Sequence, residues 1–273
     1  MLIVFLVAVL AGLVGALTGL GGGIIVTPAL TLLLGVDLRY AIGASLVSVI
    51  ATSSGAASGY VRDGLTNMRI GMFLEIATTT GAICGALLAG YTPTRALAIL
   101  FGVVLMHSAW QVVQMRQETS HGIALDPLTE KLRLSGVYHA IEGAVPYQAV
   151  RAKAGFAMMY VAGLISGLLG IGSGALKVIA MDRVMRIPFK VSTATSSFMI
   201  GVTGVASAAI YLKRGYIHPM MALPVMLGVL VGSNVGARLL PRMPVRLLRR
   251  IFAVAVAIIA IQMILHGIRG GAQ

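Results

Sequence analysis

Apolar residues occur along this chain in long runs that are separated by short polar or charged segments. A helix needs about 20 predominantly apolar residues to cross the hydrocarbon core of a bilayer, and most of these runs reach that length. None shows the alternation over about ten residues that is typical of membrane β-strands. The pattern therefore predicts an all-α polytopic membrane protein. The apolar runs cover residues 1–34, 41–61, 70–90, 96–113, 154–181, 192–212, 219–240 and 247–266.

The composition agrees with this prediction and excludes an ordinary soluble domain. Of 273 residues, 58% are hydrophobic and only 11% are charged, and the mean hydropathy is +0.95. A net charge of +13 would favour nucleic-acid binding in a soluble chain, but here Lys and Arg lie mostly between the apolar runs, where they set orientation in the membrane. We therefore expect contact with membrane lipid and no nucleic-acid partner.

Residues that could hold a metal or catalyse a reaction are sparse. Cys84 is the single cysteine, so no internal disulfide and no cysteine cluster can form. The five histidines show no metal-ligand spacing, and no Ser-His-Asp arrangement or GxxxxGK[ST] nucleotide motif occurs. We expect no enzyme activity, no cofactor and no metal.

One polar stretch, residues 114–153, separates two apolar regions and carries three of the four glutamates. Within it, residues 132–138 and 144–147 have the pattern of two short strands with a turn at 139–143, which predicts a small β-ribbon. We expect this stretch to lie in water, between a first membrane repeat at residues 1–113 and a second at 154–273.

An internal repeat relates the two halves of the chain. A shift of 151 residues aligns them without a gap, and it pairs proline, arginine and tyrosine as well as glycine. Chance alignment of glycines in apolar sequence does not explain these pairs, and many transporters are built from duplicated halves. The aligned pairs include Gly12 with Gly163, Gly21 with Gly172, Gly23 with Gly174, Ser45 with Ser196, Tyr60 with Tyr211, Pro93 with Pro244 and Arg95 with Arg246.

Charge placement decides between two topologies. If residues 1–34 crossed the membrane once, the halves would be parallel and the cations would divide ten to nine between the faces. If the first segment of each half enters and returns, the halves are inverted, and fourteen cations share one face against five on the other. The positive-inside rule favours the inverted arrangement, with both termini outside and the central loop in the cytoplasm. The five outside cations are Arg39, Arg95, Lys213, Arg214 and Arg269.

The length of the first segment also requires a break. Thirty-four residues of continuous helix would extend about 51 Å, far more than a bilayer core needs. Glycine permits backbone conformations that are closed to other residues, so we expect a glycine-broken helical hairpin in each half, at residues 19–23 and 170–174. Each half then holds one hairpin and three transmembrane helices.

The two glycine clusters are candidate anion sites. Unwound backbone there would leave N–H groups free at the start of the next half-helix, where these groups and the helix dipole favour negative charge. The alternative is that the glycines only permit close helix packing. The candidate residues are Gly21, Gly22 and Gly23 in the first half and Gly172, Ser173 and Gly174 in the second.

Few charged side chains lie inside the apolar runs, where a charge is costly unless it is paired or faces water. Lys177 follows the second glycine cluster and is the best single candidate for an anion ligand, with snorkelling to the interface as the alternative. Arg238 shares a helix face with Asn234, and both substrate binding and snorkelling fit. Glu75 could couple transport to protons, or it could pair with Arg69 or reach the interface.

Hydroxyl side chains form a stripe after each glycine cluster. Such stripes could line a polar path and solvate substrate oxygens, with ordinary interhelical hydrogen bonding as the alternative for any single residue. We take Ser45, Ser48, Thr52 and Ser196 as candidate substrate contacts. The first stripe holds Ser45, Ser48, Thr52 and Ser53, the second holds Thr193, Ser196, Ser197 and Thr203, and Thr78 and Thr79 share a face with Glu75.

Residues 12–28, GLVGALTGLGGGIIVTP, their counterpart 163–177, GLISGLLGIGSGALK, and residues 41–60 are similar to the sulfite exporter TauE/SafE family. The resemblance covers nearly the whole chain. It implies a bacterial inner-membrane transporter of sulfur-containing or organic anions, such as sulfite or a sulfonate, with the anion between the glycine clusters. The second half departs from the first, because Ser173 and Lys177 occupy the positions that Gly22 and Val26 occupy in the first half. This asymmetry suggests that one half supplies the charge.

Together these features predict a secondary anion transporter that works by alternating access in the export direction, one repeat moving against the other. Two cations against one carboxylate within the spans favour a small anionic substrate, and H+ is the expected coupling ion. A passive anion channel is one alternative. A non-transporting membrane scaffold, with a cytoplasmic partner bound at residues 114–153, is another. The sequence is also compatible with a homo-oligomer.

Overall fold

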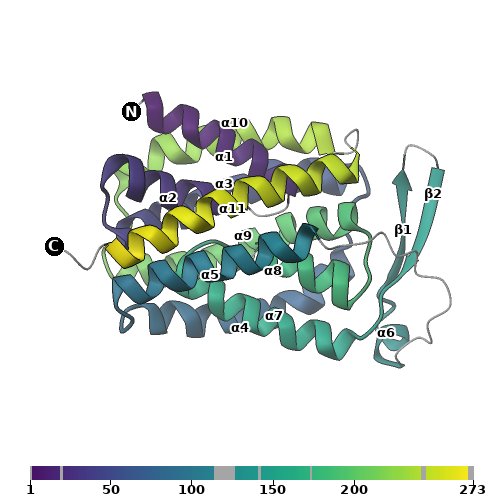
Figure 1. The fold of residues 1–273 in the computed structure, drawn as a ribbon. Coiled ribbons are helices and arrows are strands. Elements are labelled where there is room, and N and C mark those ends of the chain that lie inside the picture. Colours follow the sequence, from purple (N-terminus) through teal and green to yellow (C-terminus); the bar gives the residue numbers. More distant parts are fainter. Residues whose placement is uncertain are drawn as a thin grey trace.

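The structure, a computed structural model, describes residues 2–18, 21–113, 127–140, 143–172, 174–240 and 244–269. It is a bundle of helices with one small β-ribbon beyond one end (Figure 1). The helices of the first half are α1 (Leu2–Thr18), α2 (Gly23–Leu34), α3 (Leu38–Arg62), α4 (Met68–Ala89) and α5 (Thr94–Val113). Those of the second half are α7 (Ala152–Leu169), α8 (Gly174–Ile179), the π-helix η1 (Ala180–Val184), α9 (Phe189–Lys213), α10 (Pro219–Leu239) and α11 (Val245–Arg269).

Five of the described helices, α3, α4, α7, α9 and α10, are long enough and apolar enough to cross a membrane. The outer face of α10 illustrates the environment that such helices require. Leu223, Leu227 and Val231 recur every fourth residue, and each is about half exposed. A continuous apolar stripe of this kind is unfavourable in water but is solvated by lipid. The predicted all-α, multi-pass membrane fold is confirmed.

Each predicted glycine break separates two helices. In the first half α1 ends at Thr18 and α2 begins at Gly23, and in the second half α7 ends at Leu169 and α8 begins at Gly174. Gly21 and Gly172 have φ angles of 70° and 69°. This left-handed region strains residues with a side chain and costs glycine little, so glycine is required at both turns.

Each broken segment returns to the end of the bundle at which it starts. The backbone N–H of Val150, just before α7, donates to the carbonyl of Met185, just after η1, at 3.0 Å. In the first half, Val4 near the start of α1 and Leu34 at the end of α2 line one apolar pocket. The arms are unequal, because α1 and α7 have 17 and 18 residues, whereas α2 has 12 and the second returning arm consists of the 6 residues of α8 and the 5 of η1. Both breaks fall at the glycine clusters, residues 19–23 and 170–174, where the sequence predicts them.

The loops gather at two opposite ends of the bundle. At one end, the Arg39 guanidinium at the start of α3 donates to the Tyr216 hydroxyl at 3.2 Å and to the Thr92 carbonyl at 3.4 Å. At the other end, the Asn67 amide before α4 donates to the hydroxyl of Tyr147 in the ribbon at 2.8 Å. In Figure 1, α1 begins and α11 ends at the left, whereas the ribbon lies at the right. The N-terminal end of α1 and the C-terminal end of α11 therefore lie at the opposite end of the bundle from the β-ribbon.

The central segment contains the β-ribbon that the sequence predicts, preceded by a short helix, α6 (Pro127–Lys131). Strand β1 (Ser135–Ala140) pairs antiparallel with β2 (Gly143–Gln148). The first strand begins at residue 135 and not at 132, because the chain first turns at Arg133, whose φ is 49°. Residues 114–126 and 141–142, the latter in the predicted turn, lie outside the described residues. Burial raises the pKa of Tyr147, so its hydroxyl stays neutral and accepts the Asn67 hydrogen bond.

The two halves repeat the same elements, and a helix of each half packs along a helix of the other half. α3 and α9 both have 25 residues and begin 151 residues apart. α1 packs along α10 of the other half, and α7 packs along α4. Gly81 and Gly232, which the repeat aligns, lie directly against the carbonyls of Tyr160 and Val9, which the repeat also aligns. The two helix pairs are therefore built in the same way.

Gly232→Ala is expected to destabilise this packing. The new methyl group would overlap the Val9 carbonyl of α1, and overpacking of this kind costs about 1–3 kcal/mol. The melting temperature of the purified protein in detergent should fall. Gly59→Ala is the matched control, because its methyl group would lie 3.3 Å from the Cβ of Ala237 and alanine favours the helix. An unchanged melting temperature for Gly232→Ala would contradict the close approach of α1 and α10.

Candidate functional site

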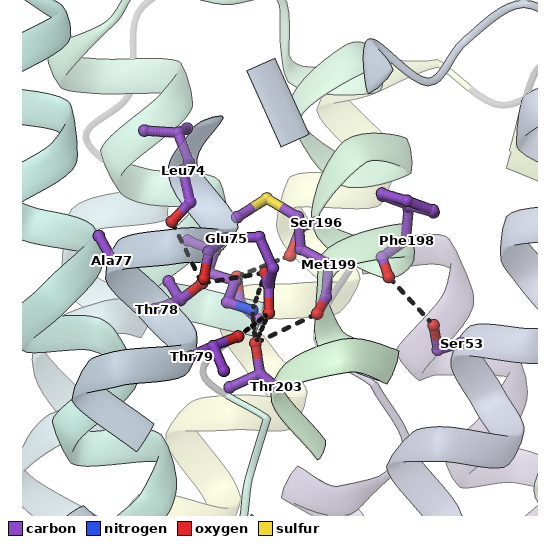
Figure 2. A network of polar contacts seen from close by, with 12 residues as sticks. Ser53, Leu74, Glu75, Ala77, Thr78, Thr79, Ser196, Phe198, Met199 and Thr203 are labelled. Carbon is purple, nitrogen blue, oxygen red and sulfur yellow. Dashed lines mark hydrogen bonds and ion pairs between the residues drawn. The ribbon is translucent and has the colours of Figure 1, made fainter. Parts of the chain in front are cut away.

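Two opposite charges meet inside the bundle. The ammonium nitrogen of Lys177 in α8 lies 3.4 Å from the carboxylate oxygen Oε2 of Glu75 in α4. The Lys177 side chain is fully buried, and that of Glu75 is only 10% exposed. Figure 2 shows the polar contacts converging on Glu75 from several elements. Because an unpaired charge at such a place is strongly unfavourable, each of these groups requires the other.

Three threonine hydroxyls complete the hydrogen bonding of the Glu75 carboxylate (Figure 2). Thr78 donates to Oε2 at 2.9 Å, Thr79 donates to Oε1 at 2.8 Å, and Thr203 in α9 donates to Oε1 at 2.6 Å. The Thr203 oxygen also accepts a hydrogen bond from the Lys177 ammonium at 2.5 Å. The Thr203 hydroxyl therefore links the two charges, and both carboxylate oxygens are satisfied, as burial of this group requires.

Local structure explains why these groups converge. α8 begins at Gly174, so Lys177 lies one turn beyond the glycine break. Thr78 and Thr79 follow Glu75 by three and four residues in α4 and therefore share its face. α9, which packs against both α4 and α8, contributes the third hydroxyl. The site thus combines one helix of the first half with two of the second.

The two glycine breaks lie on either side of one pair of buried apolar side chains. A Cβ at Gly21 or at Gly172 would contact both Val49 and Ile200. The repeat aligns Val49 with Ile200, and both side chains are fully buried. In this conformation the space between the two breaks is therefore filled by Val49 of α3 and Ile200 of α9.

Ser45 and Ser196 make equivalent contacts beside the two breaks. The Ser45 hydroxyl donates to the carbonyl of Gly23 at 3.1 Å and to that of Gly170, in the other half, at 3.0 Å. The Ser196 hydroxyl donates to the carbonyl of Gly174 at 3.4 Å. Since Ser45 contacts both breaks, it joins the two halves at the centre of the bundle.

Several other groups that the sequence predicts as substrate contacts are hydrogen-bonded within the protein. The N–H of Gly22 donates to the Thr52 hydroxyl at 3.3 Å, so this N–H group is not free for a ligand in this conformation. Thr52 and Ser48 donate to the carbonyls of Ser48 and Ser45 in their own helix, at 2.8 and 2.7 Å. Ser48 therefore makes an ordinary helix hydrogen bond, whereas Thr52 also contacts the first glycine break through Gly22.

The remaining predicted contacts lie away from this centre. Asn234 and Arg238 are exposed on α10, and the Asn234 amide donates to the carbonyl of Leu230 in its own helix at 2.9 Å. Neither side chain takes part in the hydrogen bonds around Glu75. Ser173 lies outside the described residues.

The ion pair itself was not predicted from the sequence, which presents Glu75 and Lys177 as separate candidates and Arg69 as one partner for Glu75. Arg69 is exposed in the first turn of α4, and the partner is Lys177, 102 residues further along the chain. The signal was present, because two opposite charges within apolar spans have to pair. Thr203 could also have been singled out, since the repeat aligns it with Thr52.

Comparison with known proteins places the chain in a family. Residues 4–263 match the family described as sulfite exporter TauE/SafE. The chain belongs to this family. As a TauE/SafE chain it is a membrane transporter by type, and relatives of similar length bear corresponding names.

Two such relatives come from Bacillus subtilis. The "Probable membrane transporter protein YunE" is 26% identical, with 97% of this chain and 98% of that protein aligned. The "Probable membrane transporter protein YdhB" is 27% identical over 89% of this chain and 90% of that protein. A shorter match, of 36% identity over 37% of this chain, is to 17% of the "Probable membrane transporter protein MamO" of Magnetospirillum gryphiswaldense. No solved structure matches the chain.

Proposed function

We propose that this TauE/SafE protein is a proton-coupled secondary transporter that exports a small sulfur-containing or organic anion, such as sulfite or a sulfonate, across the bacterial inner membrane. The observation that carries the proposal is Lys177, a fully buried cation one turn beyond a broken helix, held by Glu75 and Thr203. Ionisable groups at membrane depth are expensive, and they mark substrate and ion pathways.

A purely structural role accounts poorly for this pair. Apolar side chains of similar volume would hold the helices together at least as well, because burying two charges costs about as much as their attraction returns. A carboxylate, an ammonium and three hydroxyls at one place are what binding an anion and a proton requires. The pair therefore supports transport better than it supports a passive scaffold.

Alternating access is supported by the arrangement of the two halves. Each half contains a broken helix that returns to its starting end, and the two breaks lie on either side of Val49 and Ile200. The ion pair joins α4 of one half to α8 of the other. Movement of one half against the other would therefore move the substrate site relative to both ends of the bundle.

Transport can be tested in proteoliposomes loaded with radiolabelled sulfite. Efflux should saturate with sulfite concentration and should accelerate when the lumen is made more acidic than the external solution. Efflux that rises linearly with sulfite concentration and does not depend on the pH gradient would favour a passive channel. Absence of flux for sulfite and for several sulfonates would favour a scaffold. In that case deletion of residues 114–153 should abolish cellular function while Lys177→Ala should leave it intact.

The orientation we propose puts the ribbon in the cytoplasm and both termini outside. It is supported by the fourteen-to-five distribution of cations and by the position of the ribbon opposite the outer ends of α1 and α11. In a Cys84→Ser background, single cysteines at Arg39 and Lys213 should react with a membrane-impermeant maleimide added outside. A cysteine at Arg62 should react only after the membrane is permeabilised. Reaction of positions 39 and 62 from the same side would contradict the orientation.

A further inference from the structure

The Glu75 carboxylate occupies the position at Lys177 that an anionic substrate would need. The ammonium contacts Glu75 Oε2 at 3.4 Å and the Thr203 hydroxyl at 2.5 Å, and it is fully buried. As it stands, the pair carries no net charge, so it has little attraction for an anion. Sequence reasoning alone, which sets two cations against one carboxylate, overlooks this neutralisation.

Adding an anion to the intact pair would leave one uncompensated negative charge in a buried site. Such a charge is strongly unfavourable in the protein interior. If Glu75 takes up one proton when the anion binds, the site contains Lys177 as a cation, the anion and a neutral carboxylic acid, and it is again neutral overall. The proton comes from the aqueous side that is open to the site, and no covalent bond of the anion changes.

We propose, on the basis of the transport function above, that the substrate is a singly charged oxyanion that replaces the Glu75 carboxylate on Lys177 and Thr203, with one proton bound to Glu75 per anion. Thr203 then donates its hydroxyl hydrogen to the anion, as it now does to Glu75. Hydrogensulfite, alkanesulfonates and small carboxylates belong to this chemical class. A dianion such as sulfate would require a second proton at the same place.

The protonated form of Glu75 has partners ready on its own helix. Thr78 and Thr79 contact the two carboxyl oxygens at 2.9 and 2.8 Å, and both lie within one turn of Glu75 in α4. These contacts do not depend on Lys177 or on α9. A neutral carboxylic acid can therefore stay buried and hydrogen-bonded when Lys177 and Thr203 bind the anion.

Among the described residues, Lys177 is the one charged side chain that contacts Glu75. On α7, which packs along α4, Lys153 and Tyr160 are exposed, and on α9 the titratable groups Lys190, Tyr211 and Lys213 lie near the two ends. Arg69 and Cys84 on α4 itself are exposed, and Asp182 lies on η1, five residues after Lys177. A pH response of anion binding is therefore assigned to the Glu75–Lys177 pair.

The repeat shows that the first half has no equivalent charge site. The 151-residue shift aligns Lys177 with Val26, Glu75 with Met226 and Thr203 with Thr52. Two of these three counterparts are apolar. The sequence asymmetry therefore agrees with a single site that binds one anion and one proton at a time.

Calorimetric titration of the purified protein with methanesulfonate tests this proposal. A sulfonate stays a monoanion throughout the accessible pH range, so any proton taken up must bind to the protein. Titration in two buffers of different ionisation enthalpy should give about one proton taken up per anion, and the affinity should fall about tenfold per pH unit above neutrality. The double variant Lys177→Met/Glu75→Gln, which removes both charges, should neither bind methanesulfonate nor take up a proton. Asp63→Asn, which removes an exposed carboxylate outside the site, should behave like the wild type.

Binding by the wild type without proton uptake would overturn the proposal without contradicting the transport function, as would binding with proton uptake that persists in the double variant. If the double variant does not fold, the wild-type proton count alone decides. Transport of sulfite without binding of methanesulfonate would overturn the substrate class. Absence of both binding and flux for methanesulfonate and sulfite would instead overturn the proposed function on which this inference rests.

Discussion

Lys177→Met should abolish most of the saturable, pH-driven efflux of sulfite from proteoliposomes. Methionine preserves the length and the burial of the side chain but removes the charge that holds the anion. A hydrogen bond to a charged group contributes about 1.5–3 kcal/mol, which corresponds to roughly a 10- to 150-fold weaker apparent affinity. Lys177→Arg keeps the charge in a bulkier group and should retain part of the activity.

The matched control is Lys153→Met, which removes an exposed lysine at the start of α7. Its efflux should equal that of the wild type when the amount of reconstituted protein is the same. Wild-type efflux by Lys177→Met would remove Lys177 from the substrate path, and with it the observation on which the proposed function rests.

Removing one charge of the Lys177–Glu75 pair should destabilise the fold, whereas removing both charges should not. Lys177→Met leaves Glu75 buried without its cation and should destabilise the fold by about 3–5 kcal/mol near neutral pH. The double variant Lys177→Met/Glu75→Gln removes both charges and keeps an amide that can bond to Thr78 and Thr79. Its stability should be close to that of the wild type. Thermal unfolding of the purified proteins in one detergent measures both.

The exposed ion pair between Arg62 and Asp63 is the control for the buried pair. Its atoms are 3.6 Å apart, and the Arg62 side chain is 77% exposed. Arg62→Met should change stability by less than about 1 kcal/mol, because water screens such a pair. If the double variant were no more stable than Lys177→Met alone, Lys177 and Glu75 would not be energetically coupled as the contact indicates.

The broad fold was predictable because it follows from strong and local signals. The apolar runs specify helices, the cation distribution specifies which ends lie together, and the excess length of residues 1–34 requires a break near Gly21. The 151-residue repeat then extends each of these inferences to the second half. The glycine clusters at residues 19–23 and 170–174 also located the two breaks, whereas the π-helix that continues α8 from Ala180 to Val184 has no signal in the hydropathy pattern.

The site was only partly predictable, because its contacts join residues that are distant in sequence. Lys177 and Glu75 were identified by the cost of a charge within a span, but their pairing depends on how α4 packs against the second half. Ser45 is also central, and it contacts Gly23 and Gly170 of both halves. Arg238 and Asn234, by contrast, share a helix face as expected, yet α10 exposes that face. Periodicity places residues on a common face but does not show what the face contacts.

Ligand-dependent thermal stabilisation, measured side by side on the wild type and on Lys177→Met/Glu75→Gln, tests whether the substrate anion binds at Lys177. A ligand that binds the folded state raises the melting temperature by mass action, and the double variant is expected to fold. With sulfite, thiosulfate, methanesulfonate, taurine, sulfoacetate and simple carboxylates, at least one anion should stabilise the wild type and none should stabilise the double variant. Equal stabilisation of both proteins by the same anion would show that the anion binds elsewhere and would contradict a substrate site at Lys177.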